Sequence, residues 1–182
     1  YLATTDLGGA TWFLPVIFTA SVIYQAIFIC LRVFSKERLA PYIAMIIGWG
    51  GFQLCQADRF LPYLLDLSLY SMLYYGLGQL FARHNIFEKF LPKKDMMFLC
   101  FATIILFGYF YPTLMMNWPT RDFVGLPENV ISAICGIYIC YRAAIMLLSG
   151  GIFANFVELL GKNTMVVLVL HFAIFRVIFA VF

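Results

Sequence analysis

The sequence predicts an all-α protein: a polytopic bundle of about six transmembrane helices that forms a single transmembrane domain over residues 1–182. Two observations support this fold class. Of the 182 residues, 64% are hydrophobic and only 12% are charged, which is outside the range of soluble globular proteins. The apolar residues also form long runs separated by connections that hold most of the charges. A net charge of +3 without a long basic run gives no indication of nucleic-acid binding.

Six segments are long enough to cross a bilayer, because a helix needs about 20 residues to span a hydrocarbon core about 30 Å thick. They are residues 12–31, 39–55, 64–81, 96–116, 130–148 and 164–182. The second segment is the least regular, since Pro41 and the run Gly48-Trp49-Gly50-Gly51 interrupt it. Membrane helices tolerate such breaks where neighbouring helices satisfy the backbone.

The connections between these segments alternate in charge, which predicts the topology. The only basic residues of the second and fourth connections are Arg59 and Arg121. The first, third and fifth connections and their flanks hold Arg32, Lys36, Arg38, Arg83, Lys89, Lys93, Lys94, Arg142 and Lys162. The positive-inside rule places the odd connections in the cytoplasm and both chain ends outside. Topology and anionic headgroups explain the basic residues, and attraction of a polyanionic coenzyme A thioester is the second explanation.

Two smaller features have structural interpretations. The stretch IFANFVELL at 152–160 predicts either a short helix in the inner interface or a tight turn. His84 lies in a basic connection and is expected to be a solvated surface residue.

The five cysteines form no CxxC pair and lie in or beside apolar runs. They are therefore predicted to be small buried side chains and not metal ligands or disulfides: Cys30, Cys55, Cys100, Cys135 and Cys140.

Aromatic side chains make up 19% of the sequence, and many lie near predicted span ends: Trp12, Trp49, Tyr63, Tyr109, Tyr111 and Trp118. An interfacial belt explains this placement, because amphipathic rings favour the headgroup level. Trp12 and Trp118 fall on the outer side of the predicted topology. They are therefore also candidates for contact with a substrate.

His171 lies near the middle of the last apolar segment, where a charged side chain is costly. The imidazole is therefore expected to be neutral and to face the bundle interior or a wet cavity. A neutral imidazole can act as a general base toward a substrate hydroxyl. It can equally be a structural residue that bonds to a neighbouring helix.

Arg176 and Asp66 each have two interpretations as well. Arg176 lies five residues after His171 and on a different helix face; it can extend to the outer interface or stabilise an anion. Asp66 begins the third segment, close in sequence to Arg59. It can complement the helix N-terminus, or it can orient a base or bind sugar hydroxyls.

Three stretches together resemble a known family: GATWFLPVIF at 9–18, LPYLLDLSLYSMLYYGLGQLF at 61–81 and GKNTMVVLVLHFAIFRVIF at 161–179. They are similar to the later part of the membrane-bound O-acyltransferases of the acyltransferase 3 family, in particular the fucose 4-O-acetylase-like branch. The resemblance covers nearly the whole chain. Its motif positions correspond to Trp12, Phe13, Asp66, Gly161, Asn163 and His171.

The resemblance implies an enzyme in the plasma membrane of a bacterium. It would transfer an acyl group, often acetyl, from cytoplasmic acyl coenzyme A to a hydroxyl of a sugar or envelope polysaccharide, with no bound cofactor or metal. The candidate catalytic residues are His171, Asn163 and Arg176, and the candidate substrate-binding residues are Trp12, Phe13, Asp66 and Trp118. The first helices of the family, with its principal His and Arg, have no counterpart here, so the resemblance implies that His171 supports the site by positioning the substrate or its partner groups and is not necessarily the base. The chain is therefore expected to be the C-terminal part of a longer acyltransferase and inactive alone.

Two other functions predict different properties for the same residues. In part of a transporter or flippase, His171 and Arg176 would line a polar path through the membrane, but no inverted repeat is visible. In a non-catalytic membrane scaffold, His171 would make only interhelical hydrogen bonds and would border no cavity.

Overall fold

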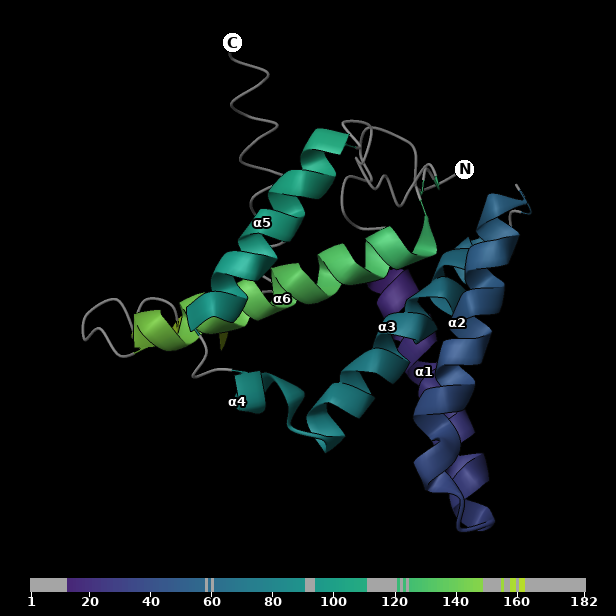
Figure 1. Ribbon diagram of the computed structural model, residues 1–182. Helices are drawn as coiled ribbons and strands as arrows, with labels where there is room; N and C mark the ends of the chain where they lie inside the picture. Colours follow the sequence, from purple (N-terminus) through teal and green to yellow (C-terminus); the bar gives the residue numbers. More distant parts are fainter. Residues whose placement is uncertain are drawn as a thin grey trace, which may run out of the picture.

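The computed structural model describes residues 13–57, 59, 61–90, 94–110, 121, 123, 125–148, 155, 158–159 and 161–162. Every regular element in these ranges is helical, which confirms the all-α prediction. In chain order the elements are α1 (Phe13–Val33), η2 (Glu37–Leu39), α2 (Ala40–Gln56), η3 (Pro62–Leu64), α3 (Leu65–Arg83), α4 (Ile86–Phe90), α5 (Lys94–Phe110) and α6 (Leu126–Leu148). Figure 1 shows their arrangement.

Five of the six predicted segments form helices with bounds close to those expected, namely α1, α2, α3, α5 and α6. Helix α6 begins four residues before the predicted start at residue 130, and its second residue is Pro127. Proline is tolerated in the first turn of a helix, where its missing N–H removes no helical hydrogen bond. Residues 111–116 of the fourth segment and the whole sixth segment, 164–182, lie outside the described residues.

The second segment is more regular than its sequence suggested, because α2 is one continuous helix. Pro41 lies in its first turn, where it costs no hydrogen bond. Gly48 and Gly51 lie where α2 touches α3. A Cβ atom at Gly48 would lie 2.2 Å from the backbone nitrogen of Leu73, and one at Gly51 would lie 2.3 Å from that of Tyr70. The glycines therefore allow the two backbones to approach closely, as small residues do between membrane helices.

Helices α1, α2 and α3 form a three-helix group (Figure 1). Each helix contributes one fully buried residue to a shared cluster: Ala20 from α1, Ala44 from α2 and Met72 from α3. The hydroxyls of Ser21 and Tyr75 form a hydrogen bond that joins α1 to α3. Small side chains at the contacts thus hold the three helices close together.

Helices α5 and α6 form a second group, packed around Cys100, Cys135 and Tyr138. Figure 1 shows α6 running at a steep angle to α1 and α2 and leading away from the three-helix group. The first turn of α6 makes the contact between the groups, because Leu126 and Val130 pack against the aromatic core of α2 and α3.

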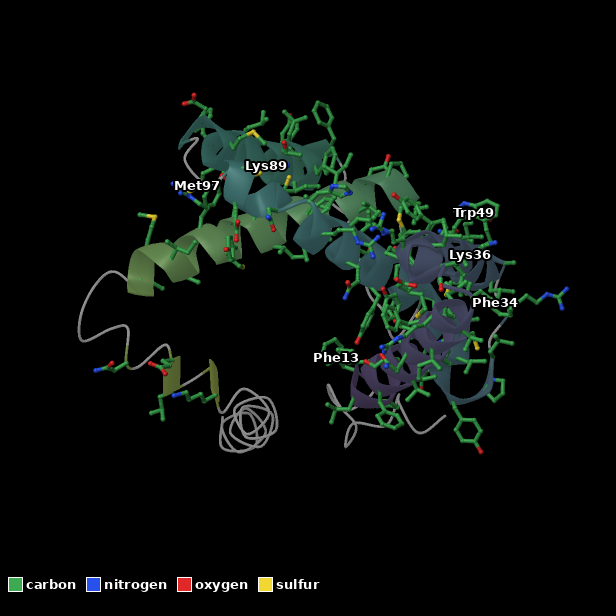
Figure 2. The ribbon with its side chains drawn as sticks, turned by 90° about the horizontal axis from the view of Figure 1, so that it is seen from below. Phe13, Phe34, Lys36, Trp49, Lys89 and Met97 are labelled. Carbon is green, nitrogen blue, oxygen red and sulfur yellow. The ribbon has the colours of Figure 1, made fainter. Side chains whose placement is uncertain are left out.

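Two of the described helices, α1 and α6, are long and apolar enough to cross a membrane, and α5 is a shorter apolar helix. Large apolar side chains also cover much of the surface; Figure 2 labels two of them, Phe34 and Trp49, at the periphery of the three-helix group. Both features are consistent with a membrane protein. A bundle of six crossings remains a prediction.

The connections gather at two ends of the three-helix group. At one end, the guanidinium of Arg83, the last residue of α3, donates a hydrogen bond of 3.1 Å to the carbonyl of Arg38, which precedes α2. The first and third connections are therefore neighbours. At the other end, the fourth connection meets the start of α3 through Arg121 and Asp66, as described below. This grouping agrees with the alternation of charges; which end faces the cytoplasm stays a prediction. We call the second end the outer end.

The cysteine prediction is confirmed at three positions and wrong at two. Cys55, Cys100 and Cys135 are buried, whereas Cys30 and Cys140 are exposed. The two exposed thiols lie on faces of α1 and α6 that no described helix covers. The apolar runs around the cysteines therefore predicted that these residues lie in helices, but not which of them lie on a buried face of the helix.

Several smaller predictions concern the connections. His84 is exposed, as expected, but the short helix α4 after it was not predicted. The described residues Asn155, Glu158, Leu159, Gly161 and Lys162 are helical, which favours the short helix over the tight turn. Gly161 and Lys162, which follow the predicted stretch, are helical too, and Lys162 pairs with Glu158 at 2.6 Å.

The predicted aromatic belt is only partly described. Tyr63 and Tyr109 lie near helix ends and are 92% and 81% exposed, as a belt requires. Trp49 does not fit this pattern, because it lies in the middle of the continuous helix α2. Trp12, Tyr111 and Trp118 lie outside the described residues.

Candidate functional site

The outer end holds a buried ion pair between Asp66 and Arg121. The Arg121 Nε atom lies 2.5 Å from Asp66 Oδ2, and Nη2 lies 3.2 Å from Oδ1. The carboxylate is fully buried and the arginine side chain is 13% exposed. Two parallel contacts between a guanidinium and a carboxylate fix both distance and orientation.

The backbone on both sides of the pair is sharply bent. Tyr63 and Leu64, which lead into α3, have φ angles of 58°, and Arg121 has a φ of 63°. Side-chain-bearing residues rarely adopt this left-handed conformation, and such strain is tolerated where the surrounding structure holds it in place. The bends bring Asp66 and Arg121 together although 55 residues separate them.

The two interpretations of Asp66 can now be compared with its contacts. Leu64 occupies the N-cap position of α3 and makes no side-chain cap. Asp66 lies in the first turn, where its charge suits the helix dipole, but its oxygens contact Arg121 and the Cys55 thiol, whose Sγ lies 3.7 Å from Oδ2. The carboxylate is therefore committed to tertiary contacts.

The last turn of α2 supports this arrangement. Gln56 Nε2 donates a hydrogen bond of 3.2 Å to the Phe123 carbonyl, two residues after Arg121. The Phe123 ring packs edge-on against Tyr70 at a centroid distance of 4.9 Å and contacts Phe52 at 6.4 Å. Residues of α2, of α3 and of the connection between α5 and α6 thus contact one another next to the ion pair.

A polar stripe runs along α3 from the ion pair toward the interior. Asp66, Tyr70 and Tyr74 follow one another at four-residue spacing and so share one helix face. The hydroxyls of Tyr70 and Tyr74 are 3.0 Å apart and hydrogen-bonded. Asn129, fully buried in the first turn of α6, lies beside Tyr70. The site therefore offers hydroxyl and amide groups next to a neutralised charge pair.

The structure places two of the predicted site residues. Asp66 is in the centre of the site. Phe13 begins α1, is 40% exposed, and lies one turn before Val16, which packs in the same core as Tyr70. Both therefore belong to the outer end. The remaining predicted residues lie outside the described residues: Trp12, Trp118, Asn163, His171 and Arg176.

Sequence reasoning missed several members of the site: Arg121, Asn129, Tyr70 and Tyr74. Arg121 carried a signal, because it is one of only two basic residues in the even connections. From the sequence, Arg121 was used only to predict the topology, and Arg59 was named as the arginine close to Asp66 in sequence. Arg59 is in fact exposed.

Comparison with protein families decides the class of protein. The model of a family described as "Acyltransferase domain" matches residues 2–182. The chain belongs to this acyltransferase family. The resemblance to the acyltransferase 3 family is thereby confirmed, whereas the fucose 4-O-acetylase-like branch stays a prediction. No curated protein and no solved structure matches the acyltransferase chain.

Proposed function

We propose that this chain is part of an integral membrane O-acyltransferase. It transfers an acyl group, in our proposal acetyl, from acyl coenzyme A to a hydroxyl of a sugar or envelope polysaccharide. The family match over residues 2–182 carries the proposal. The apolar helices α1 and α6 support a location in a bilayer, for which we propose the plasma membrane of a bacterium.

The two ends of the three-helix group suit the two substrates. Lys36, Arg38 and Arg83 surround the end opposite the ion pair. Clustered positive charge raises the local concentration of a polyanion such as coenzyme A. We therefore assign the donor to the basic end and the acceptor to the outer end. The acyl group would cross part of the bilayer between them.

Asp66 and Arg121 would act together on the acceptor side. Since the carboxylate already pairs with the guanidinium at 2.5 Å, Asp66 is a poor candidate for a general base. The pair instead holds the bent segments of the outer end in place around the acceptor. Phe13 and, in our proposal, Trp12 and Trp118 would offer aromatic faces to the sugar.

The chemical step needs a base, stabilisation of an oxyanion and alignment of two reactants. The acceptor oxygen forms a bond to the thioester carbonyl carbon while a base takes the hydroxyl proton; we propose that His171 is this base or positions the acceptor hydroxyl for the principal His of the complete protein. Asn163 and Arg176 are our candidates to stabilise the oxyanion of the tetrahedral intermediate. The intermediate collapses by breaking the C–S bond, and the coenzyme A thiolate leaves and receives the proton.

The experiment uses membranes that contain the complete protein, radiolabelled acetyl coenzyme A and envelope polysaccharide of the source cell. We expect label on the polysaccharide from the wild type, and a loss of about 10²- to 10⁴-fold for His171→Ala at equal expression, as for a missing general base. Movement of unmodified polysaccharide across the membrane without label would contradict the proposal and favour a transporter. Full activity of His171→Ala would remove His171 from the mechanism.

A further inference from the structure

Asn129 is a fully buried polar residue whose carboxamide makes no hydrogen bond within the part of the chain that the structure describes. Its backbone N–H donates to the Gly125 carbonyl at 3.2 Å, so the helix itself is satisfied. The neighbouring Glu128 also has a buried carboxylate oxygen, Oε2, without a partner among the same residues. Unpaired buried polar groups destabilise a protein, and functional sites are a common reason for keeping them.

The position of these groups connects them with the acceptor end. Asn129 lies beside Tyr70, whose hydroxyl bonds to Tyr74. The first turn of α6 follows directly after Arg121 and Phe123, which pack on α3 and α2. Asp66 is held by Arg121, whereas the carboxamide of Asn129 lies beside the Tyr70 side chain, and neither its nitrogen nor its oxygen has a hydrogen-bond partner of good geometry among the described residues.

The charges around Asn129 select the class of ligand. Arg121 neutralises Asp66, and Arg59, the other basic residue of the outer end, is exposed, so the charge next to Asn129 in the chain is Glu128, whose buried oxygen Oε2 has no partner among the described residues. A phosphate or the coenzyme A moiety would be repelled here. A neutral hydroxyl fits, because each sugar hydroxyl both donates and accepts a hydrogen bond, as the carboxamide does.

We propose that Asn129 binds a hydroxyl of a neutral sugar acceptor, with Glu128 Oε2 accepting from a second hydroxyl; this inference rests on the proposed acyltransferase function. The carboxamide is fully buried, so binding requires the first turn of α6 to shift. Leu126 and Val130, both half-buried, pack this turn against the aromatic core.

The test compares Asn129→Leu with the wild type in the complete protein, using radiolabelled acetyl coenzyme A and envelope polysaccharide. We expect the acceptor KM to rise at least about tenfold, equivalent to about 1.4 kcal/mol, and the donor KM to stay within about twofold. The melting temperature in detergent should not fall, because an apolar side chain replaces a polar one that lacks a partner. Asn129→Asp, which keeps the shape but loses the N–H donors, should raise the acceptor KM similarly.

Ser68 provides the matched control. It is fully buried at the same end of α3, but its hydroxyl donates to the Leu64 carbonyl at 3.0 Å. Ser68→Ala should leave the acceptor KM unchanged. An unchanged acceptor KM in Asn129→Leu would overturn the inference. A lower melting temperature of this variant, or its failure to fold, would also overturn it, because either result would assign Asn129 a structural role. Wild-type protein that transfers no acyl group would instead contradict the proposed function itself.

Discussion

Asp66 and Arg121 determine how the outer end is built at the scale of single residues. Burying a carboxylate alone costs several kcal/mol, and a bidentate arginine offsets this cost when the geometry is good. Both oxygens of Asp66 have partners, with Arg121 on each and the Cys55 thiol on Oδ2. The pair therefore fixes the fourth connection to α3. The pair therefore positions the fourth connection relative to α3 in addition to stabilising the fold.

We predict that Arg121→Leu destabilises the protein by about 3–5 kcal/mol, because it leaves the Asp66 carboxylate buried without its counter-ion. Thermal or denaturant unfolding in detergent measures this effect. The double variant Asp66→Leu with Arg121→Leu should recover most of the loss, since it removes both charges.

Arg59 is the control for this prediction. It is the other arginine of the even connections, but it is exposed, so Arg59→Leu should change the stability by no more than about 0.5 kcal/mol. An equal loss from Arg59→Leu and Arg121→Leu would show that general charge, and not the pair, stabilises this end.

The sequence identified Asp66 as a site residue but not its partner. Arg59 is seven residues away in sequence, whereas Arg121 is 55 residues away and reaches Asp66 only because α6 packs on α2 and α3. Tertiary packing decides such pairs, and sequence distance does not. Asn129 had no signal at all, since one amide near the start of an apolar helix resembles any polar residue near a membrane surface.

At the scale of elements, the contact between α2 and α3 holds the three-helix group together. Gly48 and Gly51 lie directly against the α3 backbone, and a Cβ at Gly76 on α3 would lie 2.5 Å from the Pro41 carbonyl. Glycines on both helices thus permit the close approach. Because this contact supports Cys55 and Asp66 at the outer end, its geometry also sets that of the site.

We expect Gly48→Ala and Gly51→Ala each to destabilise the protein by about 1–3 kcal/mol, because the added methyl groups meet backbone atoms that cannot move aside. Gly50 is the matched control, since a Cβ there meets nothing within 4 Å. Gly50→Ala should be neutral or stabilising by up to about 1 kcal/mol through helix propensity. Unfolding of the three variants in one detergent compares them, and equal effects would contradict the close packing.

The helices themselves could be predicted from the sequence, because long apolar runs bounded by charged connections determine them. The continuity of α2 could not, since Pro41 and Gly48 to Gly51 are helix breakers in isolation and only their places in the first turn and against α3 make them harmless. The five residues of α4 lie in a polar connection. So short an element gives no periodic signal.

At the scale of the whole molecule, the chain has a basic end and an outer end with a buried ion pair. This separation follows from the antiparallel order of α1, α2 and α3, which brings odd and even connections to opposite ends. The direction of α6, which leads away from the three-helix group, could not be predicted, because helices that are apolar on all sides do not show which face packs. Hydrophobic runs therefore predicted spans but not their mutual arrangement.

The topology predicts opposite labelling of the two ends in intact cells. Tyr63 is 92% exposed at the outer end, and Lys36 is exposed at the basic end. In a background where the native cysteines are replaced, Tyr63→Cys should react with an impermeant maleimide from outside. Lys36→Cys should react only after permeabilisation. Labelling of both positions from the same side would contradict the topology.

The most direct test of the central claim, that the Asp66–Arg121 pair organises the acceptor site of a membrane acyltransferase, is the acceptor-dependent transfer rate of Asp66→Asn in the complete protein. This change keeps the shape of the side chain but removes the charge that orients Arg121. With equal amounts of folded protein, we predict a loss of about 10- to 100-fold in kcat/KM for the acceptor, as expected when a hydrogen bond to a charged group is lost, while the KM for acetyl coenzyme A is retained. Wild-type kcat/KM in Asp66→Asn would contradict the claim.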